Sequence, residues 1–212
     1  MNKKLTDITL VVDRSGSMQS CRADAEGGVN AFIEDQKKGK GDAVLTLHEF
    51  DDKHDTVCEA LNIKEVEPYT LFPRGSTALL DAIGKAIIST GGRLEKMKEK
   101  DRPGLVVFVV QTDGWENMSI KFTNRMVNDL INEQEKNYSW KFIFLGAGKD
   151  AIATAAKMGF KGSTSMAYNT GQTTQVYAST SNLVSNMRDQ SVSGGDVTAF
   201  YSEEDREGAV SE

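Results

Sequence analysis

Four short apolar runs constrain the fold of this chain more than any other feature. They cover residues 8–12, 44–50, 105–111 and 141–146 and contain stretches such as "TLVV", "LVVFVV" and "FIFL". Polar residues do not alternate with apolar ones in these stretches. This is typical of strands that are buried on both faces, as in a parallel sheet covered by helices. The runs therefore predict such a sheet.

Helical patterns separate the runs. Residues 77–97 and 173–188 each place their apolar side chains on one face, residues 149–159 resemble a short helix, and Thr123 is a suitable N-cap for another. Because strands and helices alternate, we expect an α/β fold: a doubly wound, Rossmann-like, mostly parallel sheet with helices on both faces.

One further strand is expected at the edge of this sheet. Residues 54–61, "HDTVCEAL", follow the turn "FDDKH" and are predicted to pair antiparallel with residues 44–50. The length of 212 residues fits one domain, which we place at residues 1–190. Residues 191–212 lose the periodicity and become acidic, so we expect a flexible tail there.

Composition argues against several classes of partner. The net charge is −6 and no basic stripe is present, which disfavours nucleic acid. The longest apolar run, "LVVFVV", is far shorter than the ~20 residues that span a bilayer. The apolar stretch near the N-terminus is too short for a signal peptide. The two cysteines lack metal-binding spacing and suit a reduced compartment, so we expect a cytoplasmic protein.

Oxygen-bearing side chains follow two of the predicted strands. Asp13, Ser15 and Ser17 end the stretch "ITLVVDRSGSM", and Asp113 follows the strand "LVVFVV" in "VVQTDGWEN". Ligands of open parallel sheets bind outside the carboxyl ends of the strands, where these side chains fall. Two uncompensated carboxylates there would raise each other's pKa, and a divalent cation would remove that conflict.

Thr77, in "PRGSTALLDAI", adds a third hydroxyl where a Pro/Gly loop meets the next helix. The predicted set is thus two carboxylates and three hydroxyls, without His or Cys. Such a set suits Mg²⁺, with Mn²⁺ or Ca²⁺ as alternatives, and does not suit zinc. The competing interpretation is that "DRSGSM" is only a capped turn that begins the next helix.

These residues resemble the motif of the von Willebrand factor A (vWA) domain and its metal-ion-dependent adhesion site. That motif is Asp-x-Ser-x-Ser, then a distant Thr and a distant Asp, and the resemblance extends over about residues 5–190, nearest to small intracellular bacterial and phage members. It implies that the three hydroxyls bind metal directly, that the two aspartates often act through water, and that a partner's Glu or Asp completes the coordination. The matching residues are Asp13, Ser15, Ser17, Thr77 and Asp113.

A rim of other side chains is predicted around this site. Trp115 follows Asp113 closely and either anchors a partner or folds back onto the sheet edge. Glu116 is expected to contact solvent or partner rather than metal. The residues predicted to line the partner-binding rim are Arg14, Phe72, Arg74, Trp115 and Glu116.

The resulting functional hypothesis is a non-enzymatic, Mg²⁺-dependent protein-binding module. Its partner is a protein that presents Asp or Glu, and the family resemblance adds ATPases and multiprotein complexes as candidates. One alternative is a Mg²⁺-dependent phosphatase-like hydrolase, although Ser15 stands where haloacid-dehalogenase-like phosphatases have a second Asp. Another is a structural or assembly protein that needs no metal. His48 and His54 are expected to be hairpin residues, and "FLGAGKDA" lacks phosphate-loop spacing.

Overall fold

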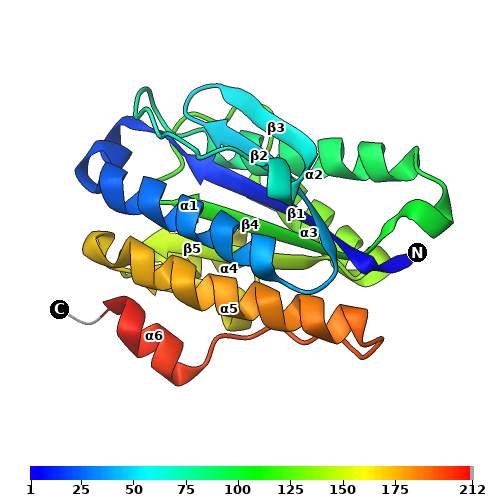
Figure 1. The fold of residues 1–212 in the computed structure, drawn as a ribbon. Helices are drawn as coiled ribbons and strands as arrows, with labels where there is room; N and C mark the ends of the chain where they lie inside the picture. Colours follow the sequence, from blue (N-terminus) through cyan, green and yellow to red (C-terminus); the bar gives the residue numbers. More distant parts are fainter. Residues whose placement is uncertain (211–212) are drawn as a thin grey trace.

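A six-stranded sheet with the order β3-β2-β1-β4-β5-β6 runs through the molecule in the computed structural model, which describes residues 1–210 (Figure 1). Neighbouring strands are parallel, except that β3 pairs antiparallel with β2. The predicted fold class, with its antiparallel edge strand, is confirmed. The strands are β1 (Asn2–Asp13), β2 (Asp42–Phe50), β3 (His54–Asn62), β4 (Pro103–Thr112), β5 (Lys141–Ala147) and β6 (Ser165–Tyr168).

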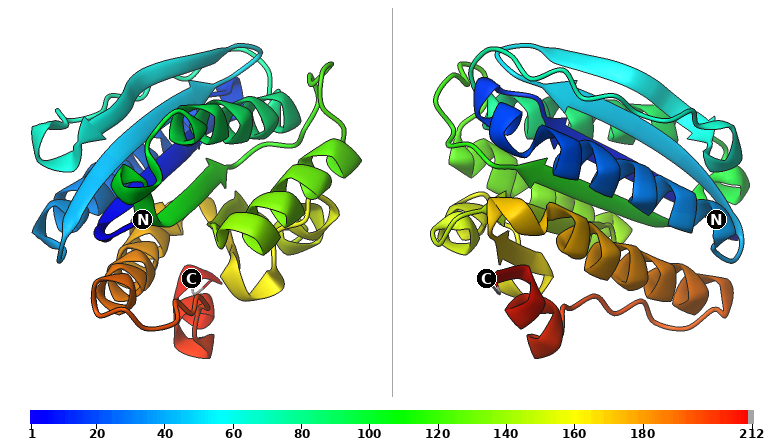
Figure 2. Two further views of the ribbon diagram at one scale, coloured as in Figure 1. Left: turned by 90° about the vertical axis from the view of Figure 1, so that its right-hand side faces the viewer. Right: turned by 60° about the vertical axis from the view of Figure 1, so that its left-hand side comes forward.

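Helices cover both faces of the sheet. Figures 1 and 2 show α1 and α5 on one face and α2, α3 and α4 on the other, with α6 beside α5. Within residues 1–210 no helix has both the length and the hydropathy needed to cross a bilayer. The α-helices are α1 (Arg22–Lys38), α2 (Leu79–Glu95), α3 (Asn124–Tyr138), α4 (Ala151–Lys157), α5 (Thr173–Val192) and α6 (Glu203–Val210). The 3₁₀ turns are η1 (Gly16–Cys21), η2 (Ile63–Glu65), η3 (Glu99–Asp101), η4 (Gly162–Thr164) and η5 (Thr170–Gln172).

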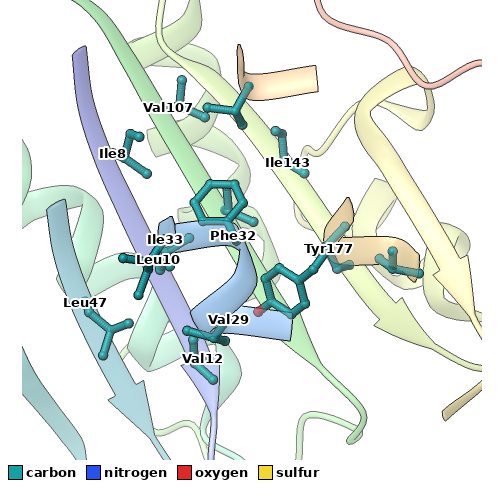
Figure 3. Packing of buried hydrophobic residues seen from close by; sticks show 14 of the residues in the cluster. Ile8, Leu10, Val12, Val29, Phe32, Ile33, Leu47, Val107, Ile143 and Tyr177 are labelled. Atoms are coloured by element: carbon teal, nitrogen blue, oxygen red, sulfur yellow. The ribbon is translucent and has the colours of Figure 1, made fainter. Parts of the chain in front are cut away.

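The two-sided core explains why the strand sequences do not alternate. Neighbouring residues of β1 point to opposite faces: Leu10 belongs to the core under α1 and α5, and Val11 to the core under α2, α3 and α4. Figure 3 shows Phe32 of α1 and Tyr177 of α5 on the first of these faces. Both faces of a central strand must therefore be apolar.

Helix α1 was not among the predicted helices, because its sequence "RADAEGGVNAFIEDQKK" carries two glycines and few apolar residues. Close packing against α5 accounts for one of those glycines. A Cβ atom added to Gly28 would lie 2.4 Å from a ring carbon of Tyr177. Contact with the rest of the domain, rather than a strong apolar stripe, stabilises this helix.

Residues 191–212 were predicted to form a flexible tail after a domain at residues 1–190. The described part of that segment packs against the domain. Tyr201 is buried, and its hydroxyl lies 2.7 Å from Thr180 Oγ1. The backbone N–H of Asn169, next to β6, donates to the carbonyl of Ala209 in α6 at 3.1 Å. Residues 211–212 lie outside the described residues.

The sheet brings the carboxyl ends of β1 and β4 to one edge. These strands are adjacent and parallel, with Val12 opposite Gln111. Asp13, the last residue of β1, and Asp113, the first residue after β4, therefore leave the sheet side by side. The candidate site is built on this edge.

Candidate metal centre

Three loops meet at the carboxyl ends of β1 and β4. The loop after β1 is bound to the loop before α2 through the N–H of Gly16, which donates to the carbonyl of Gly75 at 3.1 Å. The loop before α2 is bound to the loop after β4 through Thr77 and Asn117. Backbone hydrogen bonds thus hold in place the loops that carry all five predicted ligands.

The hydroxyl and carboxylate groups of these loops lie within hydrogen-bond distance of one another. The Oγ atoms of Ser15 and Ser17 are 3.0 Å apart, and the Ser17 hydroxyl donates to Asp113 Oδ1 at 2.7 Å. The backbone N–H of Ser15 donates to Asp13 Oδ1 at 2.6 Å. Ser17 therefore links the motif after β1 to the carboxylate after β4.

Gly114 shows where the oxygens converge. A Cβ atom added to this residue would lie 2.9 Å from Thr77 Oγ1 and 3.4 Å from each of Asp13 Oδ2 and Ser17 Oγ. One point in space is thus surrounded by a carboxylate oxygen and a hydroxyl oxygen from the end of β1 and the turn after it, and by the hydroxyl oxygen of Thr77 from the loop before α2. The glycine leaves that point open.

Both carboxylates have raised pKa values. Burial raises the pKa of Asp13 to about 6; hydrogen bonds from Thr112 and Ser15 lower it, and the nearby charge of Asp113 raises it further. Burial also raises the pKa of Asp113, which the hydrogen bond from Ser17 partly offsets. Burial is thus the main cause, and the repulsion expected from the sequence is a smaller one. A bound cation would favour the charged form of both groups.

The chemistry of the donors fits a hard divalent cation. Two carboxylates, which would balance a double positive charge, and three hydroxyls surround the edge, and such all-oxygen sets suit Mg²⁺, Mn²⁺ or Ca²⁺. Among residues 1–210, no group of three or more His, Cys, Asp or Glu side chains could hold a metal ion. The site thus depends on its hydroxyls as well as its carboxylates.

Two residues that the sequence did not indicate support the carboxylates. The hydroxyl of Thr112, the last residue of β4, donates to Asp13 Oδ2. The thiol of Cys21, at the end of η1, lies 3.9 Å from Asp113 Oδ2, and burial raises its pKa to about 11. Cys21 therefore contacts the site as a protonated thiol. The position of Thr112 directly before Asp113 is the one signal in the sequence that could have pointed to this hydroxyl.

Arg14 does not belong to the rim, which corrects the prediction. Its side chain is only 5% exposed and is paired with the carboxylates of Glu49, Asp51 and Asp55 from the β2–β3 hairpin. The alternation of the strand end explains this, because Arg14 points away from the side on which Asp13 and Ser15 lie. Its ion pairs attach the loop after β1 to the β2–β3 hairpin.

The carboxylate of Glu116 is likewise hydrogen-bonded within the protein. Its carboxylate accepts hydrogen bonds from the backbone N–H groups of Leu80, Met118 and Ser119 at 2.8, 2.9 and 2.7 Å. It is therefore not a free rim residue. It fixes the loop after β4 to the start of α2, where the helix dipole favours a negative charge.

The remaining rim residues are exposed on this face. Phe72 is 64% and Trp115 66% exposed, and Arg74 is also exposed while pairing with Asp51. Trp115 thus projects into solvent and does not fold back onto the sheet edge. The Arg22 guanidinium lies 5.5 Å from the centre of the Phe72 ring, so Phe72 stands close to the start of α1.

His48 and His54 lie apart from the site, at the β2–β3 hairpin. His54 Nε2 is 2.9 Å from His48 Nδ1, which also lies 3.0 Å from Thr56 Oγ1. They are hairpin residues, as the sequence suggested.

Solved structures with this arrangement of elements were found, although no protein-family model and no curated protein matches the sequence. The vWF domain of the type V pili tip protein Mfa5 from Porphyromonas gingivalis matches with a TM-score of 0.60 and 12% identity, over 91% of this chain and 98% of that one. A von Willebrand factor type A protein from Catenulispora acidiphila matches with a TM-score of 0.57 and 12% identity, over 85% and 43% of the two chains.

Manganese-loaded TRAP protein from Plasmodium vivax matches with a TM-score of 0.54 and 14% identity, over 82% of this chain and 72% of that one. The chain spans less than half the length of several matched structures, the Catenulispora protein among them. At these identities the likeness concerns the fold. The mostly parallel six-stranded sheet, its antiparallel edge strand and the helices on both faces are those of the von Willebrand factor A fold.

Proposed function

We propose that this protein is a metal-dependent protein-binding module whose Mg²⁺ site is completed by a carboxylate of the partner. The observation that carries the proposal is the convergence of Asp13, Ser17 and Thr77 oxygens around one point beside Gly114. A vWA fold whose neighbours include the vWF domain of a pilus tip protein supports a role in protein interaction.

Each of the five residues has a part in holding the ion. The hydroxyls of Ser15, Ser17 and Thr77 are the proposed direct ligands, and Asp13 and Asp113 supply the compensating charge, directly or through water. When bound, Mg²⁺ supplies a Lewis-acidic position that attracts an anionic oxygen. The protein keeps the other ligands fixed by the hydrogen bonds between its three loops.

The choice of metal is also a proposal. The matched structure of the TRAP protein is manganese-loaded, which supports a divalent ion as the cofactor of this fold. Mg²⁺ is our first candidate, because its demand for about six oxygen ligands leaves a position for a partner after the hydroxyls and waters are counted. Mn²⁺ and Ca²⁺ remain as alternatives to be compared directly.

We propose binding rather than catalysis. The groups that contact the two carboxylates are the hydroxyls of Thr112 and Ser17, the Ser15 backbone and the Cys21 thiol, and none of them is a general base at neutral pH. Both cysteines of the chain are free thiols, which supports the cytoplasm as the proposed compartment. The partner we propose is a protein, with ATPases and multiprotein complexes as candidates, rather than nucleic acid or a membrane.

Thermal unfolding with and without millimolar Mg²⁺ tests the metal site. At a metal concentration 100 times the dissociation constant, wild-type protein should gain about 2.7 kcal/mol of stability. Asp13→Ala should gain nothing. The matched control is Asp129→Ala, an exposed aspartate on α3, which should respond as the wild type does.

Capture of partners with immobilised protein tests the function. Partners retained in Mg²⁺, released by EDTA and absent with Asp13→Ala support the proposal. Partners that bind equally in EDTA and to Asp13→Ala would contradict it and favour a metal-independent assembly role. Hydrolysis of a phosphate ester that disappears with Asp13→Ala would favour the enzymatic alternative.

A further inference from the structure

A groove of about 500 Å³ lies between the edge strand β3 and the segment 65–72 that follows it. Its walls come from β2, β3, α1 and that segment, so it lies on the side of the sheet that α1 covers. In Figure 2 this segment runs alongside the β2–β3 hairpin. The volume is in the range of ligand sites.

The lining of the groove is mainly apolar. Ile33 and Leu47 are buried at its base, and Leu61 and Pro68 form part of its walls. Val57, on β3, is 51% exposed. A long apolar surface beside an edge strand suits an extended polypeptide, whose alternate side chains can enter the groove.

The charged side chains of the groove are all acidic. Glu49, Glu65 and Glu67 line it, and no Lys or Arg does. Glu49 is paired with Arg14, and Lys37 Nζ donates to the carbonyl of Val66 at 3.0 Å, whereas Glu65 and Glu67 are exposed and form no salt bridge with any residue from 1 to 210. The groove therefore favours an occupant that carries positive charge.

One end of the groove reaches the candidate metal centre. Phe72 lines the groove and is also an exposed rim residue beside Arg22, where α1 begins after η1. Two residues further, the backbone N–H of Arg74 donates to the carbonyl of Arg14, between Asp13 and Ser15, at 2.7 Å. A chain leaving the metal centre over Phe72 therefore enters the groove directly.

From this we infer that the groove holds an extended segment of the partner protein, with apolar side chains and at least one Lys or Arg. The segment continues from the acidic residue that completes the metal site, so this inference rests on the proposed function. The metal centre and the groove would then bind one linear motif of the partner, which has an acidic residue, an apolar stretch and a basic residue.

A random peptide library displayed on phage supplies the probe. The library is panned on the immobilised full chain in Mg²⁺, and bound phage are eluted with EDTA. We expect the enriched peptides to share an Asp or Glu, apolar residues and a Lys or Arg. Synthetic versions of these peptides then give affinities for the variants.

Two groove variants keep the fold intact because they alter exposed side chains. Val57→Lys removes apolar surface and adds a repelling charge, and should weaken binding at least tenfold. Its matched control is Ile88→Lys, on α2 at the other face of the sheet, where the side chain is 54% exposed. Glu65→Gln with Glu67→Gln should weaken binding roughly threefold to thirtyfold, more at low salt. Glu95→Gln with Glu99→Gln makes the same charge change elsewhere and should have no effect.

The outcomes separate the inference from the proposed function. Mg²⁺-dependent peptides that bind the groove variants as tightly as the controls overturn the groove and leave the metal-dependent function standing. Peptides sensitive to the groove variants but indifferent to EDTA overturn the shared motif. A library without enriched peptides overturns the inference. The thermal unfolding experiment with Mg²⁺ still tests the metal centre independently.

Discussion

Thr77 and Asn117 exchange two hydrogen bonds. The backbone N–H of Thr77 donates to Asn117 Oδ1 at 3.0 Å, and the backbone N–H of Asn117 donates to the carbonyl of Thr77 at 3.0 Å. Thr77 is a proposed metal ligand and buried, and Asn117 is exposed on the loop after β4. A residue outside the ligand set thus fixes the position of one ligand.

Replacing Asn117 by Ala should weaken Mg²⁺ binding about tenfold or more, as loss of an outer-shell partner typically does. The metal-free protein should lose about 1 kcal/mol, the usual worth of a hydrogen bond. Calorimetric titration with Mg²⁺ and thermal unfolding in EDTA measure the two effects separately. Asn132→Ala, an exposed position on α3, is the control. Unchanged Mg²⁺ affinity in Asn117→Ala would show that Thr77 is held without this pair.

Filling the point of convergence should abolish the metal response. In Gly114→Ala the new methyl group would lie 2.9 Å from Thr77 Oγ1, so the hydroxyl must shift and the ion loses its space. Overpacking should cost about 1–3 kcal/mol without metal. The test is the difference in melting temperature between Mg²⁺ and EDTA, measured within the variant.

Gly171→Ala provides the comparison for that experiment, because a Cβ atom there has no neighbour within 4 Å. This control should keep the full Mg²⁺ response. A Gly114→Ala protein that Mg²⁺ stabilises as strongly as the wild type would place the ion elsewhere.

Arg14 should be critical for stability rather than for partner contact. Arg14→Met would remove the guanidinium that pairs with the part-buried carboxylate of Glu49 and the buried carboxylate of Asp51, would leave Asp51 with Arg74 alone, and should cost about 3–5 kcal/mol. Arg74→Met, at a largely exposed side chain, should cost about 1 kcal/mol or less. Urea unfolding in EDTA compares the two. Equal losses would mean that Arg14 is as replaceable as a surface residue.

The histidine pair should make the protein sensitive to mild acid. Burial and the charge of His54 lower the pKa of His48 to about 4, and burial and the charge of Lys85 lower that of His54 to about 4. An unfolded histidine titrates near 6.5. Between these values the unfolded chain binds more protons, so stability is present above pH 6.5 and is lost as the pH falls toward 4.

Comparison with His48→Gln/His54→Gln isolates this contribution. Between pH 7 and pH 5, wild-type protein should lose about 4 kcal/mol relative to the variant, about 2 kcal/mol for each histidine. Asp13 acts in the opposite direction, because its pKa is raised to about 6, but it contributes equally to both proteins and cancels. Parallel stability curves for the two proteins would refute the effect. The charged groups that also face this pair are Arg93, Asp55 and Arg14.

Much of the fold was predictable because its strongest signals are local. Runs such as "LVVFVV" are long enough to identify central strands, and Thr123 does cap α3 by accepting from the N–H of Met126 at 3.3 Å. Strand β6 was missed, since four residues carry little periodicity. The packing of Tyr201 under α5 was missed because an acidic stretch with few apolar residues gives no local sign of where those few are buried.

The candidate site, like the fold, could be predicted only in part. The types of the proposed metal ligands and their order along the chain can be read from the sequence, because Asp13 and Asp113 follow recognisable strands. The sequence does not show the environment of each side chain. Arg14 lies next to Asp13 in sequence, yet its burial depends on carboxylates from the β2–β3 hairpin. The role of Asn117 in positioning Thr77 could not be predicted from the sequence either, because the two residues are distant in the chain.

The adjacency of β1 and β4 has a consequence for when the candidate site forms during synthesis of the chain. Ninety-nine residues separate Asp13 from Thr112, so the first strand leaves the ribosome long before its second neighbour exists. Until β4 is made, β1 has β2 on one side and an open edge on the other. Such non-local pairing is slow and exposes the nascent chain to misassembly. The proposed metal centre therefore cannot form early in folding, because it is completed only after the second half of the sheet has closed against the first.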